Sequence, residues 1–141
     1  MTKRKPDYND PYIAVIGGAN MDICGASMAA LSMHDSNPGK VTISPGGVGR
    51  NIAENLSLLG VSCQFFSAVG DDIFGDQLIK EGEKSGIDMS GVLRIAGMRT
   101  STYLAVLDEQ GDMAVSINDM EIVGEITPDY IDIHHENIKK A

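Results

Sequence analysis

Short apolar runs that end in glycine and alternate with helical segments constrain this fold more than any other sequence feature. The runs cover residues 13–16, which end before Gly17, and 64–69, which end before Gly70. Apolar runs of this length bounded by glycine are typical of buried strands. Because strands and helices alternate along the chain, we predict an α/β fold with a parallel sheet.

Two segments carry the helical signal. The first, 50–59, places four apolar residues on one predicted face: Ile52, Ala53, Leu56 and Leu59. The second, 73–85, is expected to begin after an N-cap at Asp71 or Asp72 and to stop at Gly86. Both helices follow a glycine-bounded turn, as expected for strand–helix units.

The pattern changes after residue 100. Residues 101–107 and 113–117 are rich in β-branched and aromatic side chains, and the polar segment 108–112 between them predicts a hairpin. Thr127 followed by Pro128 predicts a helix start, and this helix is expected to run toward the C-terminal lysines. A further short strand is predicted at 41–43.

Charge and composition exclude several classes of protein. The net charge is −9, and residues 71–141 hold fifteen acidic but only six basic residues. Phosphate contacts need clustered basic side chains, so we expect no nucleic-acid partner. No apolar run approaches the roughly 20 residues of a membrane span. With no signal-peptide pattern at the N-terminus, a cytoplasmic protein is expected.

The segment from Pro45 to Ala53 is the strongest candidate for a ligand site. Gly46, Gly47 and Gly49 precede a predicted helix, so the backbone can approach a ligand closely and present N–H groups to it. The amide of Asn51 can both donate to and accept from a sugar hydroxyl. A flexible strand-to-helix turn with no ligand explains the glycines equally well.

Asn20 and Asp22 follow the first predicted strand. A carboxylate can accept hydrogen bonds from both hydroxyls of a vicinal diol, and an adjacent amide can bind a further hydroxyl. Ligands of α/β sheets bind at the loops after the carboxyl ends of the strands. A simple Asn/Asp turn is the alternative, which the nearby glycine segment makes less convincing.

Other motifs give no site. Gly39-Lys40 is followed by Val41, so there is no Walker A sequence, and Gly17-Gly18 lacks the dinucleotide-binding spacing. His134 and His135 diverge by about 100° on a helix. We therefore predict no metal site in this chain, and no catalytic nucleophile.

Two motifs together resemble the ribokinase-like (PfkB) carbohydrate kinases. The first is Gly18-Ala-Asn-Met-Asp22, and the second is Gly46-Gly-Val-Gly-Arg-Asn-Ile-Ala53, followed by Gly60 and Gly70. Within that family the segments 35–40, 45–53 and 117–120 look most like those of pseudouridine kinases. The resemblance covers the chain from about Tyr12 onward. It implies a partial Rossmann-like parallel sheet with helices, plus a small β-sheet lid formed by segments of about 22–45 and 92–118.

The resemblance also assigns roles to residues. Asp22 and Asn20 match the positions that hold sugar hydroxyls, Gly46 and Gly47 the backbone that closes over the sugar, and Asn51 a further hydroxyl ligand. Thr102 and Asn118 lie on the implied lid, where we expect them to contact the base. A structural role in a lid strand explains these two residues equally well. The lid also implies a homodimer.

The implied reaction is phosphoryl transfer from ATP to a sugar hydroxyl, the 5′-hydroxyl for pseudouridine, with Mg²⁺ and in some relatives a monovalent cation. The catalytic Asp of this family lies in a Gly-Ala-Gly-Asp motif, which this sequence lacks. We therefore expect residues 1–141 to be the N-terminal part of one kinase domain, with no catalytic residue and no activity alone. A ribokinase, a fructokinase, another nucleoside kinase, a non-catalytic sugar or nucleoside binding module and a dimerisation module remain alternatives.

Overall fold

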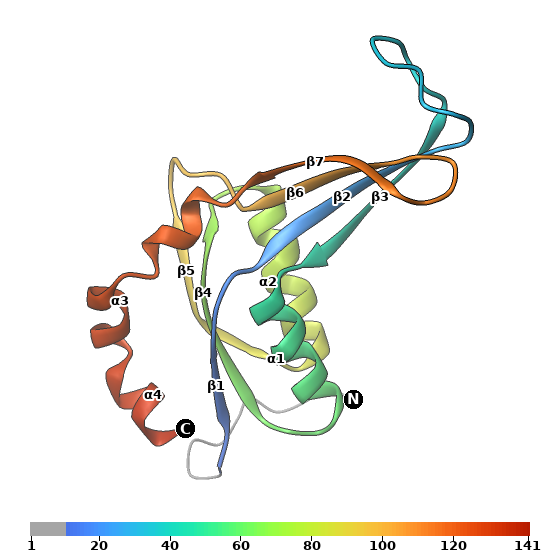
Figure 1. Ribbon diagram of the computed structural model, residues 1–141. Coiled ribbons are helices and arrows are strands. Elements are labelled where there is room, and N and C mark those ends of the chain that lie inside the picture. Colours follow the sequence, from blue (N-terminus) through green and yellow to red (C-terminus); the bar gives the residue numbers. More distant parts are fainter. Residues whose placement is uncertain (1–10) are drawn as a thin grey trace.

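The computed structural model describes residues 11–141 as two sheets that meet at the start of the second strand (Figure 1). Three parallel strands form the first sheet in the order β1-β4-β5, and four strands form the second in the order β3-β2-β6-β7. The predicted α/β fold with a small separate sheet is confirmed. No described helix is long and apolar enough to cross a membrane.

The first sheet contains β1 (Ile13–Ile16), β4 (Cys63–Gly70) and β5 (Asp88–Ile95). Every residue of β4 is buried because the strand lies between the other two and is covered by helices. Val15 of β1 pairs with Phe65 of β4, and Phe66 pairs with Gly91 of β5. The core of the molecule is centred on this strand.

Helices cover both faces of the first sheet (Figure 1). On one face lie α1 (Val48–Leu58) and α2 (Ile73–Ser85). Asp72 caps α2 by accepting a hydrogen bond from the Gly75 amide, and Gly86 ends the helix with a left-handed φ of 90°. The predicted bounds of α2, its cap and its stop are confirmed.

The second sheet extends away from the core (Figure 1). Its strands are β2 (Asn20–Ser27), β3 (Gly39–Gly46), β6 (Thr102–Leu107) and β7 (Met113–Asp119). The strands β6 and β7 form the predicted antiparallel hairpin, whereas β2 and β6 pair in parallel. Because β2 follows β1 after only three residues, the two sheets are joined directly at one end of β2.

One strand of the first sheet was not expected. β5 begins at Asp88, so residues 92–95 belong to the parallel sheet and not to the second sheet, which resumes only at Thr102. A Cβ atom on Gly91 would lie 2.6 Å from the ring of Phe66. This close packing requires glycine within the strand, and a glycine hides the strand signal in the sequence.

The helical predictions at α1 and at the C-terminus need correction. Of the predicted apolar face, Ala53 is buried and Leu56 packs against the core, whereas Ile52 and Leu59 are exposed. The other buried residues of α1 are small or polar: Gly49, Arg50 and Ser57. After a 3₁₀ turn (η1, Glu121–Glu125), the expected single C-terminal helix is broken at His134. Its two parts are α3 (Pro128–Ile133), which begins after the predicted Thr127 cap, and α4 (His135–Lys140).

Candidate functional site

Asn20 and Asp22 lie on the first residues of β2, not in a loop after β1 as expected. The loop is only three residues long because the chain enters the second sheet at Asn20. Both residues have the same strand parity, so their side chains share one face. Asn20 is buried and Asp22 is half-buried.

The two side chains are held together by a direct hydrogen bond. Nδ2 of Asn20 donates to Oδ1 of Asp22 over 2.6 Å. Opposite this pair lies the end of β3, where Asn20 pairs with Gly46 and Asp22 pairs with Ser44. A Cβ atom on Gly46 would lie 2.1 Å from Oδ2 of Asp22, so only glycine leaves room for the carboxylate here. The structure therefore brings Asn20, Asp22 and Gly46 into contact range.

Gly47 turns the chain from β3 into α1. Its φ of 100° lies in the region that favours glycine, and a Cβ atom there would lie 2.6 Å from the carbonyl oxygen of Gly18. Among the described residues no side chain caps α1, and the amide of Arg50 donates to Gly18 over 3.3 Å. The glycine segment thus packs α1 against the connection between β1 and β2.

Asn51 lies in the first turns of α1 and is exposed. Its Oδ1 atom accepts a hydrogen bond of 3.3 Å from Nη1 of Arg50. The same guanidinium is buried and forms two hydrogen bonds of 2.7 Å with the carboxylate of Glu54. The backbone of Asn51 continues the helix by donating to Gly47 over 2.9 Å.

The register of the second sheet decides which residues share the face of Asp22. Asp22 pairs with Tyr103, and Tyr103 pairs with Asn118. Residues paired across neighbouring strands have side chains on the same face. Asn118 therefore lies on the Asp22 face, as does Tyr103, a half-buried aromatic residue that sequence reasoning missed. Tyr103 could be identified only from the strand register, which the structure gives and the sequence does not.

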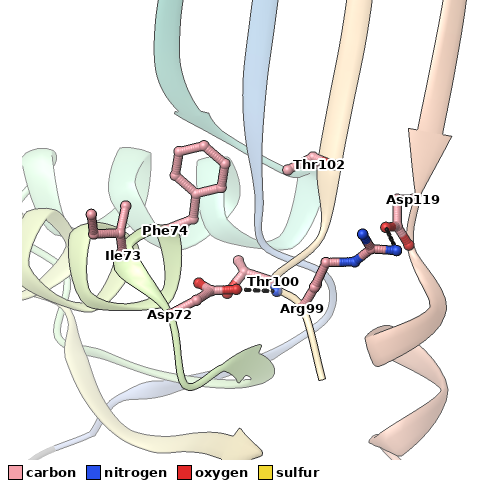
Figure 2. A pocket seen from close by; sticks show the side chains of 7 residues that line it. All are labelled: Asp72, Ile73, Phe74, Arg99, Thr100, Thr102 and Asp119. Atoms are coloured by element: carbon pink, nitrogen blue, oxygen red, sulfur yellow. Dashed lines mark hydrogen bonds and ion pairs between the residues drawn. The ribbon is translucent and has the colours of Figure 1, made fainter. Parts of the chain in front are cut away.

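Thr102 lies on the opposite face. It pairs with Asp119 and lines a pocket of about 380 Å³, together with the beginning of α2 and residues just before β6 (Figure 2). The other lining residues are Asp72, Ile73, Phe74, Arg99 and Thr100. At its mouth Arg99 and Asp119 form an ion pair of 3.6 Å. The structure thus separates Thr102 from Asn118.

Asp72 joins α2 to the segment that leads into β6 (Figure 2). Its carboxylate accepts hydrogen bonds from the amide of Thr100 over 2.8 Å and from the hydroxyl of Thr100 over 2.7 Å. Burial alone would raise the pKa of this carboxyl, but the hydrogen bonds from Thr100 and Gly75 together lower the pKa below its usual value. Asp72 is therefore a structural carboxylate.

The comparison with protein families decides what kind of protein carries this geometry. The model of the pfkB family of carbohydrate kinases matches residues 10–138. The chain belongs to this family. The resemblance inferred from the two sequence motifs is therefore confirmed.

Individual relatives agree with this family assignment. The chain is 47% identical over 130 residues to a pseudouridine kinase from Escherichia coli (strain K12), covering 92% of this chain and 42% of that protein. A solved structure from Clostridium perfringens, assigned as a sugar kinase, is 41% identical with a TM-score of 0.85, covering 94% of this chain and 42% of the other. Ribokinase from Thermotoga maritima is 27% identical with a TM-score of 0.66, covering 77% and 36% of the two chains.

This chain spans about two fifths of the length of the relatives it matches.

Among residues 11–141, no group of three or more His, Cys, Asp and Glu side chains is placed to hold a metal ion. The side chain of His134 instead packs between the rings of Phe66 and Tyr130, at 5.3 and 4.8 Å.

Proposed function

We propose that this chain is the substrate-binding part of a kinase that transfers the γ-phosphoryl group of ATP to the 5′-hydroxyl of pseudouridine. The observation that carries the proposal is the Asn20–Asp22 pair packed against Gly46. The identity of 47% to a pseudouridine kinase supports the choice of nucleoside. We propose the cytoplasm as its location.

The geometry supports binding of a sugar diol. The carboxylate of Asp22 accepts from Asn20 through Oδ1, which leaves Oδ2 and the remaining lone pairs to accept from ligand hydroxyls. The backbone of Gly46 and Gly47 can approach the sugar because neither residue has a side chain. Asn51 supplies a further polar group on the adjoining helix.

The Asp22 face of the second sheet supports contact with the base. Tyr103 pairs with Asp22 and Asn118 pairs with Tyr103 on the next strand, so an aromatic ring and an amide share the Asp22 face. An aromatic ring can stack on a base, and an amide can bind its hydrogen-bonding edge. We propose that this face lies over the bound nucleoside, and we assign no base contact to Thr102, which faces the pocket on the other side.

We place the ATP, Mg²⁺ and monovalent-cation sites in segments of the whole protein outside this chain. The described residues do not fit these groups, because they gather no set of metal-binding side chains and the sequence has no Gly-Ala-Gly-Asp motif. We therefore derive no phosphoryl-transfer step here. We propose that the chain alone binds the nucleoside without phosphorylating it.

Isothermal titration of the chain with pseudouridine tests the proposal, with uridine and ribose as competitors for specificity. We expect saturable binding of pseudouridine and weaker binding of the other two ligands. Asp22→Ala should abolish the binding, whereas Asp132→Ala, an exposed carboxylate on α3, should not change it. Equal loss in both variants, or binding that survives Asp22→Ala, would contradict the assigned site.

We also propose that two copies associate through the second sheet. The face opposite Asp22 carries exposed apolar side chains from three strands, β3, β6 and β7: Val41, Ile43, Leu104, Val115 and Ile117. Apolar surface of this kind marks an interaction site. Because the face is apolar and nearly free of charge, a second copy of the same face is a suitable partner.

Sedimentation of paired variants tests this association. Ile43→Lys places a charge on the apolar face, whereas Thr42→Lys places the same charge on the Asp22 face of the same strand. We expect the first variant to be monomeric and the second to retain the dimer. A dimer that persists in Ile43→Lys would exclude this surface as the interface.

A further inference from the structure

Arg50 is a buried cation that the ligand site described above does not use. Only 7% of its side chain is accessible, and Glu54 holds its guanidinium by two hydrogen bonds of 2.7 Å. Glu54 is fixed in turn, because the hydroxyl of Ser85 at the end of α2 donates to its Oε1 atom over 2.9 Å. The guanidinium therefore has a fixed position at the buried side of α1.

The contact between Arg50 and Asn51 determines which end of the Asn51 amide faces outward. A guanidinium has only hydrogen-bond donors, so the Asn51 atom that faces Nη1 of Arg50 must be the carbonyl oxygen. The NH₂ group is then directed away from Arg50. The same reasoning fixes the orientation of the Asn20 amide. The carboxylate of Asp22 can only accept, so it accepts from the NH₂ group of Asn20.

We propose that Arg50 is a positioning residue that makes Asn51 a hydrogen-bond donor toward the ligand. The inference rests on the proposed function and deepens it, since it states the polarity of the sugar site. Asp22 offers only acceptors and Asn51 then offers a donor. A ligand group that contacts both side chains would have to donate to Asp22 and accept from Asn51, as a hydroxyl can and as an ether oxygen or a ketone cannot.

Stability alone does not account for an arginine at this position. A buried ion pair often contributes no more than apolar residues of the same volume, because both charges lose their hydration. Nε of Arg50 is buried and has no hydrogen-bond partner among residues 11–141, which adds to this cost. A residue that is expensive to bury and that holds a site amide is better explained by its action on that amide.

Nuclear magnetic resonance of the unliganded chain tests the positioning step directly. We expect the side-chain amide of Asn51 to be ordered in the wild type, and its order parameter to fall below about 0.6 in Arg50→Met. Arg50→Lys keeps one donor and should restore part of the order. Because Arg50→Met removes the ion-pair partner of Glu54 and leaves only the hydrogen bond from Ser85, Glu54→Gln is the second variant, which loosens the guanidinium without removing it. An unchanged Asn51 amide in these variants would overturn the proposal.

Titration with pseudouridine tests the polarity. Asn51→Asp keeps an acceptor for Arg50 but removes the NH₂ donor, so we expect the Kd to rise about tenfold or more. An unchanged Kd in Asn51→Asp would show that the donor is not used. If the wild-type chain binds no nucleoside or sugar, the proposed function fails, while the amide resonances still decide the role of Arg50.

Discussion

The two sheets of this molecule use similar apolar residues in opposite ways. All eight residues of β4 in the first sheet are buried, whereas six of the eight residues of β3 in the second sheet are exposed. Phe65 is fully buried, whereas Ile117 on β7 is 64% accessible. The first sheet thus carries the core, whereas the second sheet leaves most of its side chains exposed.

This difference predicts a large contrast in stability between matched truncations. Phe65→Ala should lower the free energy of unfolding by about 3–5 kcal/mol, because it leaves a cavity in the core. Ile117→Ala should change it by less than about 0.5 kcal/mol, since the side chain is mostly exposed. Urea denaturation of both variants measures the contrast. Equal losses would show that the second sheet contributes to the core as much as the first.

The link between the two sheets should have an intermediate effect. Asp72→Ala removes the cap of α2 and both hydrogen bonds to Thr100, which precedes β6. We expect a loss of about 1–2 kcal/mol at neutral pH, measured by thermal or urea denaturation. Asp76→Ala is the control, because it removes an exposed first-turn carboxylate and its ion pair with Arg94 but neither the cap nor the hydrogen bonds to Thr100.

The same link predicts a pH dependence. The folded pKa of Asp72 is lower than the unfolded value, so its carboxylate stabilises the fold above pH 3.8. As the pH falls below that value toward the folded pKa, this contribution is lost. The difference in stability between wild type and Asp72→Ala should therefore be constant near neutral pH and shrink in acid. A difference that grows in acid would contradict the assigned cause.

The smallest expected effect concerns the other side of the first sheet. The hydroxyl of Tyr130 on α3 donates to the carbonyl oxygen of Gly91 on β5, and burial raises the pKa of Tyr130 to about 12. Tyr130→Phe should cost about 1 kcal/mol. In the wild type, stability should fall as the pH rises from about 10 to about 12, because the unfolded tyrosine ionises first. Absorbance of tyrosinate at increasing pH follows this ionisation.

The sequence was sufficient where local chemistry decides the structure. The Asp72 cap, the Gly86 stop and the hairpin between β6 and β7 each depend on residues close together in the chain. The family motifs at residues 18–22 and 46–53 were also readable, because glycines and polar residues stand at fixed spacing. From these features the sequence alone predicted the fold class and the five main candidate site residues: Asn20, Asp22, Gly46, Gly47 and Asn51.

The sequence was insufficient where distant contacts decide. β5 was missed because Gly91 is required by the ring of Phe66 on a neighbouring strand, and no local pattern reveals that contact. The choice between Thr102 and Tyr103 depends on the pairing of β6 with β2, since adjacent residues face opposite sides. The burial of Arg50 was also missed, because its partner Glu54 is held by Ser85 at the end of α2, a contact between segments far apart in the chain.

The pairing of β2 with both of its neighbours limits which changes in chain length this protein can tolerate. Asp22 is aligned with Ser44 on one side and with Tyr103 on the other. Deleting one residue from β2 would exchange the two faces of the strand, moving apolar side chains to the face that now holds Asp22 and the carboxylate to the opposite face. The loop at 28–38 and the turn at 108–112 carry no such alignment, so insertions and deletions during evolution should accumulate there and spare the strands.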